Sequence, residues 1–185
     1  ILVSTSFYLS YSCFHVLITF PFILYKYSLK IRITSIFKNF NWFLFSVGIM
    51  KGSYLLLIEL PVKTTIKIGK LGLIDFPSAW YIYVGSAMNG IDSRIKRHFS
   101  LNKKYHWHID YFLDIAHLKQ AFYKVSKFKE ECTISERFNL LFNSIPSFGS
   151  SDCECNSHLF YGDKEQFLDL INSLDFFRAD EKKFI

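Results

Sequence analysis

The stretch Ser53–Leu60, which reads SYLLLIEL, is a short apolar run that ends at Pro61. An apolar run of this length, stopped by proline, is typical of a strand that is buried on both faces. Thr64–Ile68 alternates and is rich in β-branched residues, and Trp80–Val84 reads WYIYV. These two runs predict further strands, and the short distances along the chain between all three favour an antiparallel meander.

Amphipathic segments follow these strands. Ile91, Ile95 and Phe99 recur every four residues, which predicts a helix with one apolar face. The other expected elements are helices at His106–Ala116, Glu130–Asn143 and Lys164–Leu174, a strand at Ala121–Phe128 and a loop at Ser144–Asn156. This order of strands and helices predicts a small α+β domain.

The net charge of the chain gives little information about its function. The formal net charge is +6 over 185 residues, from 22 basic and 16 acidic side chains. Four of the basic residues and none of the acidic ones lie in residues 1–49, which leaves a net charge of only +2 for residues 50–185. The four cysteines do not indicate a secreted disulfide scaffold, so we expect a cytoplasmic protein.

Residues 1–49 form an apolar leader that allows two interpretations. A window such as Phe7–Tyr25 has no formally charged side chain, and roughly 17–25 apolar residues are enough to cross a bilayer. Residues 1–25 would then be a membrane anchor. We favour the alternative that residues 1–49 are a non-native translation of AT-rich DNA upstream of Met50, because Phe, Ile, Leu, Tyr, Ser, Lys and Asn dominate there. The folded domain is therefore expected at residues 50–185.

Three potential metal ligands lie close together near the end of this domain. Cys153, Cys155 and His158 follow a C-x-C-x2-H spacing, and two thiols with an imidazole are suitable ligands for Zn²⁺. The candidates for a fourth ligand are Cys132, Asp152 and a histidine of residues 106–108. A hydrogen-bonded loop with packed thiols explains the same pattern equally well.

An acidic residue falls on the apolar face of the predicted helix Glu130–Asn143. On a helical wheel of about 100° per residue, one face carries four apolar residues, Ile134, Phe138, Leu141 and Phe142. Glu131 falls about 60° from Ile134, within this face, whereas Glu136 falls near 200°. A buried carboxylate must be paired, hydrogen-bonded or bound to a cation. Glu131 is therefore a candidate cation ligand, or else an acidic residue that the helix dipole stabilises in the first turn.

The order of several motifs resembles the GIY-YIG nuclease superfamily. Gly52-Ser53-Tyr54 on the first strand and Tyr83-Val84-Gly85 on a later strand resemble the two motifs that give the superfamily its name. Arg94 on the following helix and Glu131 on a later one complete the order, and His98 follows the arginine by four residues, as in several members. A serine replaces the usual isoleucine of the first motif, and the gap between the two motifs is longer than in most relatives.

The motifs resemble most closely one uncharacterised, mainly archaeal branch of that superfamily, a domain of unknown function. The resemblance covers about residues 51–161. The motifs that carry it are Tyr83-Val84-Gly85-Ser86-Ala87, Arg94-x-x-Arg97-His98, His106-Trp107-His108-Ile109-Asp110-Tyr111, Glu131-Cys132 and Phe148-Gly149-Ser150-Ser151-Asp152-Cys153-x-Cys155-x-Ser157-His158. The resemblance implies a GIY-YIG-like domain with a central, mostly antiparallel sheet of three strands flanked by helices.

The resemblance also implies a divalent-metal-dependent endonuclease that hydrolyses phosphodiester bonds of DNA or RNA, in repair or recombination. Glu131 would hold Mg²⁺ or Mn²⁺, Tyr54 would help to deprotonate the attacking water, and Tyr83 would position that water. Arg94, assisted by His98, would stabilise the transition state, since a guanidinium fits a phosphate. The residues expected to contact nucleic acid are Lys96, Arg97, Lys103, Lys104, His106 and His108.

Several alternatives stay open. In other branches the catalytic glutamate lies deeper in its helix, which would favour Glu136, whereas the periodicity favours Glu131. The fold could bind nucleic acid without cutting it, with Trp80, Tyr105 and Trp107 as stacking side chains or as core. A zinc-stabilised adaptor built on Cys153, Cys155 and His158 is a third possibility. Nucleic acid, DNA before RNA, is the expected partner; no small-molecule cofactor is expected, and a membrane is expected only if residues 1–25 are genuine.

Overall fold

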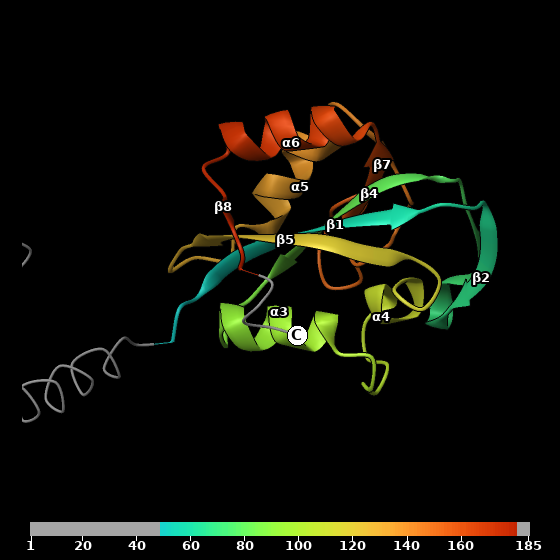
Figure 1. The fold of residues 1–185 in the computed structure, drawn as a ribbon, viewed down its shortest axis with the longest axis horizontal. Helices are drawn as coiled ribbons and strands as arrows, with labels where there is room; N and C mark the ends of the chain where they lie inside the picture. The colour runs from blue at the N-terminus through green and yellow to red at the C-terminus, as the bar shows by residue number, and fades with distance from the viewer. Residues whose placement is uncertain (1–48, 181–185) are drawn as a thin grey trace, which may run out of the picture. The chain divides into compact units, whose positions relative to one another are not determined.

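Residues 49–180 are described by a computed structural model, drawn in Figure 1. The apolar leader lies outside the described residues, apart from Ile49, so both of its interpretations stay predictions. Within residues 49–180, no helix combines the length and the apolar character that crossing a membrane requires.

This part of the chain forms two sheets and four helices. The strands are β1 (Gly52–Leu60), β2 (Thr64–Ile68), β3 (Gly72–Phe76), β4 (Ala79–Ser86), β5 (His117–Val125), β6 (Asn143–Ser144), β7 (Leu159–Gly162) and β8 (Phe177–Arg178). The helices are α3 (Ile91–Phe99), α4 (His108–Phe112), α5 (Glu131–Asn139) and α6 (Lys164–Ser173). A 3-10 turn, η1 (Gly69–Leu71), connects β2 to β3.

The main sheet is antiparallel throughout, with the strand order β6-β7-β4-β1-β5-β8. The α+β class and the antiparallel sheet are confirmed, but the predicted number of three strands is wrong, because the sheet has six. The central strands β4, β1 and β5 were all predicted, whereas β6, β7 and β8 have two, four and two residues. Strands this short are too short to show a clear alternation in the sequence. The predicted meander is also wrong, because β2 pairs with β3 in a separate hairpin.

The central strand β1 is covered on both faces, as its unbroken apolar run predicts. Leu56 and Ile58 belong to the core that includes residues of α3 and α4, and Leu55 and Leu57 to the core that includes residues of α5 and α6. Figure 1 shows these two pairs of helices on opposite faces of the sheet. Successive side chains of a strand point to opposite faces, so one run supplies both cores.

Two helices are shorter than the sequence pattern predicts. α5 ends at Asn139 because the chain then turns into β6, and Leu141, expected on the apolar face, is 65% exposed. α4 begins only at His108, because the carboxylate of Asp110 accepts hydrogen bonds from the backbone N–H groups of His106 and Trp107. This side-chain contact replaces the helical turn that the sequence suggested before residue 108.

Candidate active site and metal centre

Tyr54 of β1 and Gly85 of β4 lie opposite each other in the central strand pair. A Cβ atom at Gly85 would lie 2.3 Å from Cζ of Tyr54 and 2.4 Å from its hydroxyl oxygen. Non-bonded carbon atoms pack at about 3.5–4.0 Å, so any larger residue would collide with the ring. The glycine of the Tyr-x-Gly motif therefore has a steric role, because it accommodates the phenol of the other motif.

Tyr54, Tyr83 and His98 pack together in a buried group that we call the phenol–histidine cluster. The hydroxyl oxygen of Tyr54 lies 2.9 Å from Nε2 of His98, at hydrogen-bond distance. The ring centroids are 6.3 Å apart for the two tyrosines and 5.3 Å apart for Tyr54 and His98. Because β1, β4 and α3 supply one member each, the cluster joins the centre of the sheet to one helix.

Burial favours the neutral forms of all three members of this cluster. Loss of solvation raises the pKa of Tyr54 well above 10.0 and also raises the pKa of Tyr83. The same cause lowers the pKa of His98 from 6.5 to about 3. A neutral Tyr54 can donate to Nε2 of His98, whereas Nδ1 has no hydrogen-bond partner among residues 49–180. At neutral pH His98 therefore supplies no positive charge for a phosphate.

Arg94 and Arg97, both on α3, have different environments. Their guanidinium carbons lie 4.1 and 4.2 Å from the ring centroid of Trp107, within cation–π range. Arg97 also makes a two-pronged ion pair with Asp110, at 2.7 and 2.9 Å. Arg94 has no carboxylate partner within the described part of the chain, and its charge acts on both phenols of the cluster. Of the two arginines, Arg94 is the one available to an anionic ligand.

Glu131, at the start of α5, is the inward-facing carboxylate that the helical wheel predicts. It is 7% exposed, whereas Glu136 on the same helix is exposed. Its charge acts on Tyr54 and Tyr83. The ammonium nitrogen of Lys129 lies 2.7 Å from the Glu131 carboxylate and 3.3 Å from that of Asp152. The sequence analysis missed Lys129, because it stands in a polar segment without periodicity.

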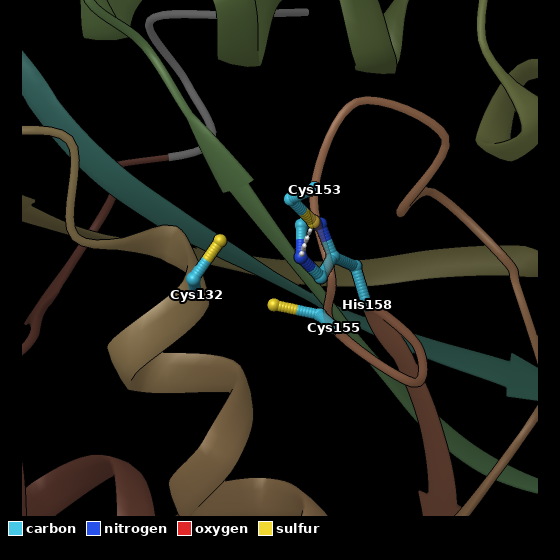
Figure 2. A group of neighbouring side chains, drawn as sticks. All are labelled: Cys132, Cys153, Cys155 and His158. Atoms are coloured by element: carbon cyan, nitrogen blue, oxygen red, sulfur yellow. Dashed lines mark hydrogen bonds between the residues drawn. The ribbon is translucent and has the colours of Figure 1, made fainter.

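A second group of side chains, which we call the Cys3His cluster, consists of Cys132, Cys153, Cys155 and His158. Its four ligand atoms all lie within 4.8 Å of one another. Figure 2 shows Cys132 at the start of α5, with the other three side chains converging on it from the loop before β7. Burial raises the pKa of Cys132 and of Cys155, so their thiols stay protonated unless a cation stabilises the thiolates. The cluster can hold a metal ion such as zinc.

Of the candidates for a fourth ligand, Cys132 is thus the one that the structure brings to the other three. Asp152 instead forms an ion pair with Lys129. Nδ1 of His108 accepts a hydrogen bond from the backbone N–H of Gly149, at 3.1 Å. Spacing along the chain could not choose among these candidates, because Cys132 reaches the other three ligands only through the packing of α5 against the loop before β7.

Comparison with known proteins places the chain in a family. Residues 53–176 match the family described as "Domain of unknown function DUF123". The chain belongs to the DUF123 family. No curated protein and no solved structure matches it. The DUF123 match includes every member of the phenol–histidine cluster and of the Cys3His cluster, so both lie within the matched domain.

The basic residues of the DUF123 domain that were predicted to contact nucleic acid also differ in their surroundings. The exposed ones are Lys96, Lys104 and His106. The ammonium group of Lys103 instead donates to the backbone oxygen of His98, at 3.1 Å. Lys103 and Arg97 are therefore engaged with the domain itself, which leaves the exposed residues as the better candidates for contacts with a backbone phosphate.

Proposed function

We propose that the chain is a divalent-metal-dependent endonuclease that hydrolyses phosphodiester bonds of DNA or RNA. The observation that carries the proposal is that the charges of Arg94 and Glu131 both act on the buried phenols of Tyr54 and Tyr83. These side chains come from two strands and two helices. Metal-dependent hydrolysis of a phosphodiester uses a ligand for the cation, a donor to the phosphate and a group that orients water, and the four side chains offer groups of these three kinds.

The donor set around Glu131 suits a hard divalent cation. Its carboxylate is mostly buried and already interacts with a cation, the ammonium of Lys129 at 2.7 Å. Mg²⁺ is usually held by one or two carboxylates together with substrate phosphates. Mg²⁺ or Mn²⁺ held by Glu131 would supply Lewis-acid activation of a phosphate oxygen. A more specific role, in repair or recombination, rests only on the resemblance to the superfamily.

Four residues of the chain would then have separate roles in the reaction. Arg94, stacked on Trp107, donates to the phosphate and stabilises the negative charge that develops in the transition state. Tyr83 orients the attacking water. Tyr54 accepts a proton from that water only as a phenolate, so the positive charge of Arg94 must offset the burial that raises its pKa. His98 holds the Tyr54 hydroxyl in place.

One observation favours a non-catalytic nucleic-acid-binding module instead. Burial keeps Tyr54 protonated and lowers the pKa of His98 to about 3, so Tyr54 cannot accept a proton and His98 is only a weak base at neutral pH in the described state. Arg94, stacked on Trp107, could still bind a phosphate backbone, because a guanidinium recognises phosphate through paired donors.

A cleavage screen distinguishes the two functions. The full chain is incubated with Mg²⁺ or Mn²⁺ and with supercoiled, linear, flapped and branched DNA, and with RNA. Arg94→Ala should lower the cleavage rate by about 100- to 1000-fold and weaken binding only modestly. Lys67→Ala is the control, because Lys67 is an exposed basic residue on β2 with no assigned role in binding.

The same screen tests the metal ligand. Glu131→Gln should abolish cleavage, whereas Glu136→Gln, an exposed change on the same helix, should leave it intact. Equal rates for Arg94→Ala and the unchanged chain would refute the assigned role. Binding to these substrates without any cleavage would favour the binding module.

A further inference from the structure

The Cys3His cluster joins two distant segments of the chain. Cys132 lies in the first turn of α5, and Cys153, Cys155 and His158 lie in the loop between β6 and β7. We propose that these four side chains bind one zinc ion in a closed, tetrahedral site. The proposal does not depend on nuclease activity.

The distances suit zinc without a large rearrangement. Zn–S and Zn–N bonds of about 2.3 and 2.0–2.1 Å in a tetrahedron place two sulfurs about 3.8 Å apart and a sulfur and a nitrogen about 3.5–3.6 Å apart. The sulfur of Cys153 and Nε2 of His158 are 3.5 Å apart. The largest separation in the cluster is 4.8 Å, which small side-chain rotations can shorten. All four positions are therefore within reach of one ion.

The chemistry of the donors favours zinc over the harder divalent cations. Three thiols and one imidazole match the Cys3His set of structural zinc sites, while Mg²⁺ and Ca²⁺ prefer oxygen ligands. Four protein ligands complete a tetrahedron, so the ion would have no open position for a substrate. The geometry thus points to a structural rather than a catalytic ion.

The protein holds the ligand atoms in place through contacts outside the cluster. The backbone N–H of His158 donates to the oxygen of Phe148, at 2.7 Å, and its own carbonyl accepts from the N–H of Val84, at 2.9 Å. His158 itself is only 2% exposed. The backbone N–H of Cys153 donates to the oxygen of Ser150, at 3.4 Å. The loop is thus anchored to β4 next to the cluster.

One cation and one helix end beside the cluster would stabilise an ion with three thiolates. Zn²⁺ with three thiolates and a neutral imidazole carries a net charge of −1. The ammonium group of Lys129 bridges the carboxylates of Glu131 and Asp152, each next to a cysteine of the cluster, and so offsets part of their negative charge. The first turn of a helix, where Cys132 lies, also favours negative charge.

Zinc would have one structural consequence for the neighbouring site. Because Glu131 directly precedes Cys132, the ion would tie the start of α5, and with it the Glu131 carboxylate, to the loop before β7. This consequence for catalysis rests on the proposed nuclease function, whereas zinc binding does not.

Metal analysis tests the proposal directly. The full chain, purified under reducing conditions and checked for folding by circular dichroism, should contain one zinc ion per chain by mass spectrometry of the metal. Cys155→Ser should lose the ion, whereas Cys13→Ser, outside the described residues, and His117→Ala, an exposed histidine on β5, should keep it. A folded, reduced chain that takes up no zinc would overturn the site, and so would a disulfide among Cys132, Cys153 and Cys155.

Two measurements on the unchanged chain keep the test valid if Cys155→Ser fails to fold. Replacement of zinc by Co²⁺ should give visible bands of tetrahedral cobalt and the charge-transfer absorption of three thiolates. Chelation of the metal should lower Tm by roughly 10 °C, because the free energy of binding a structural ion contributes to the stability of the folded chain. An octahedral cobalt spectrum, or a Tm that chelators leave unchanged, would contradict the proposal.

Discussion

The phenol–histidine cluster and the Cys3His cluster are built in different ways. Tyr54, Tyr83 and His98 stand on two paired central strands and one helix, and their positions follow from the register of β1 against β4. The Cys3His cluster instead depends on an irregular loop meeting the first turn of α5. Regular hydrogen-bonded elements position the first cluster, whereas three of the four residues of the second lie on a loop that individual backbone hydrogen bonds hold in place.

This difference predicts that the two clusters respond independently to perturbation. Packing changes inside the sheet should affect the first cluster and leave metal binding unchanged. Chelation should affect the second cluster and leave the Tyr54–His98 hydrogen bond intact. Two contacts link the neighbourhoods: the ammonium group of Lys129 bridges Glu131 and Asp152, and the backbone N–H of Val84 donates to the carbonyl of His158.

Gly85→Ala should have the largest effect and should be confined to the first cluster. The added Cβ would lie 2.3 Å from Cζ of Tyr54, so the ring or the strand must move. Overpacking of this kind costs about 1–3 kcal/mol in the free energy of unfolding, measurable by urea denaturation. In a Tyr54→Ala background the same substitution should cost less, because the colliding ring is gone. Equal costs in both backgrounds would show that Tyr54 is not the obstacle.

Acidification should destabilise the first cluster through His98. Its pKa is about 3 in the folded chain against 6.5 for an unperturbed histidine, because burial disfavours the imidazolium. Between these values the unfolded chain binds more protons, so stability falls as the pH falls from 6.5 towards 3, by at most about 1.4 kcal/mol per pH unit. The charged groups that act on His98 are Lys103, Asp110, Arg97 and Arg94.

Urea denaturation between pH 7 and pH 4 measures this slope. His98→Gln should flatten it, whereas His117→Ala, which removes an exposed histidine, should leave it unchanged. The slope is compared above about pH 5, because Asp110, whose pKa the hydrogen bonds from Arg97 lower from 3.8 to about 2, adds its own loss of stability below that pH. A slope that persists in His98→Gln would assign the acid sensitivity to another group.

Lys129→Ala should have the smallest effect, although it touches both neighbourhoods. About half of its side chain is exposed (49%), so the ion pairs with Glu131 and Asp152 are screened by solvent. Exposed ion pairs contribute about 0–1 kcal/mol, and the loss should shrink further in high salt. Lys127→Ala, an exposed change in the same segment, is the control. A loss above about 2 kcal/mol would mean that Lys129 holds the two neighbourhoods together.

Local patterns in the sequence predicted much of the fold, and the family resemblance pointed to the members of the first cluster. The apolar run of β1, the aromatic run of β4 and the four-residue repeat of α3 were identified because each element shows its own periodicity. The inward direction of Glu131 followed from the same arithmetic, and its burial confirms it. The nuclease roles of these residues stay predictions.

Contacts between segments far apart in the chain appeared only in the tertiary structure. Strands β6 to β8 are too short to carry a pattern. The ion pair of Arg97 with Asp110 links α3 to α4, and Cys132 meets its three partners from the loop before β7. Periodicity records which face of an element is apolar, but not which other element that face will meet. The packing of the whole chain determines which elements meet, because all apolar faces have to be buried and all strands paired in one common arrangement.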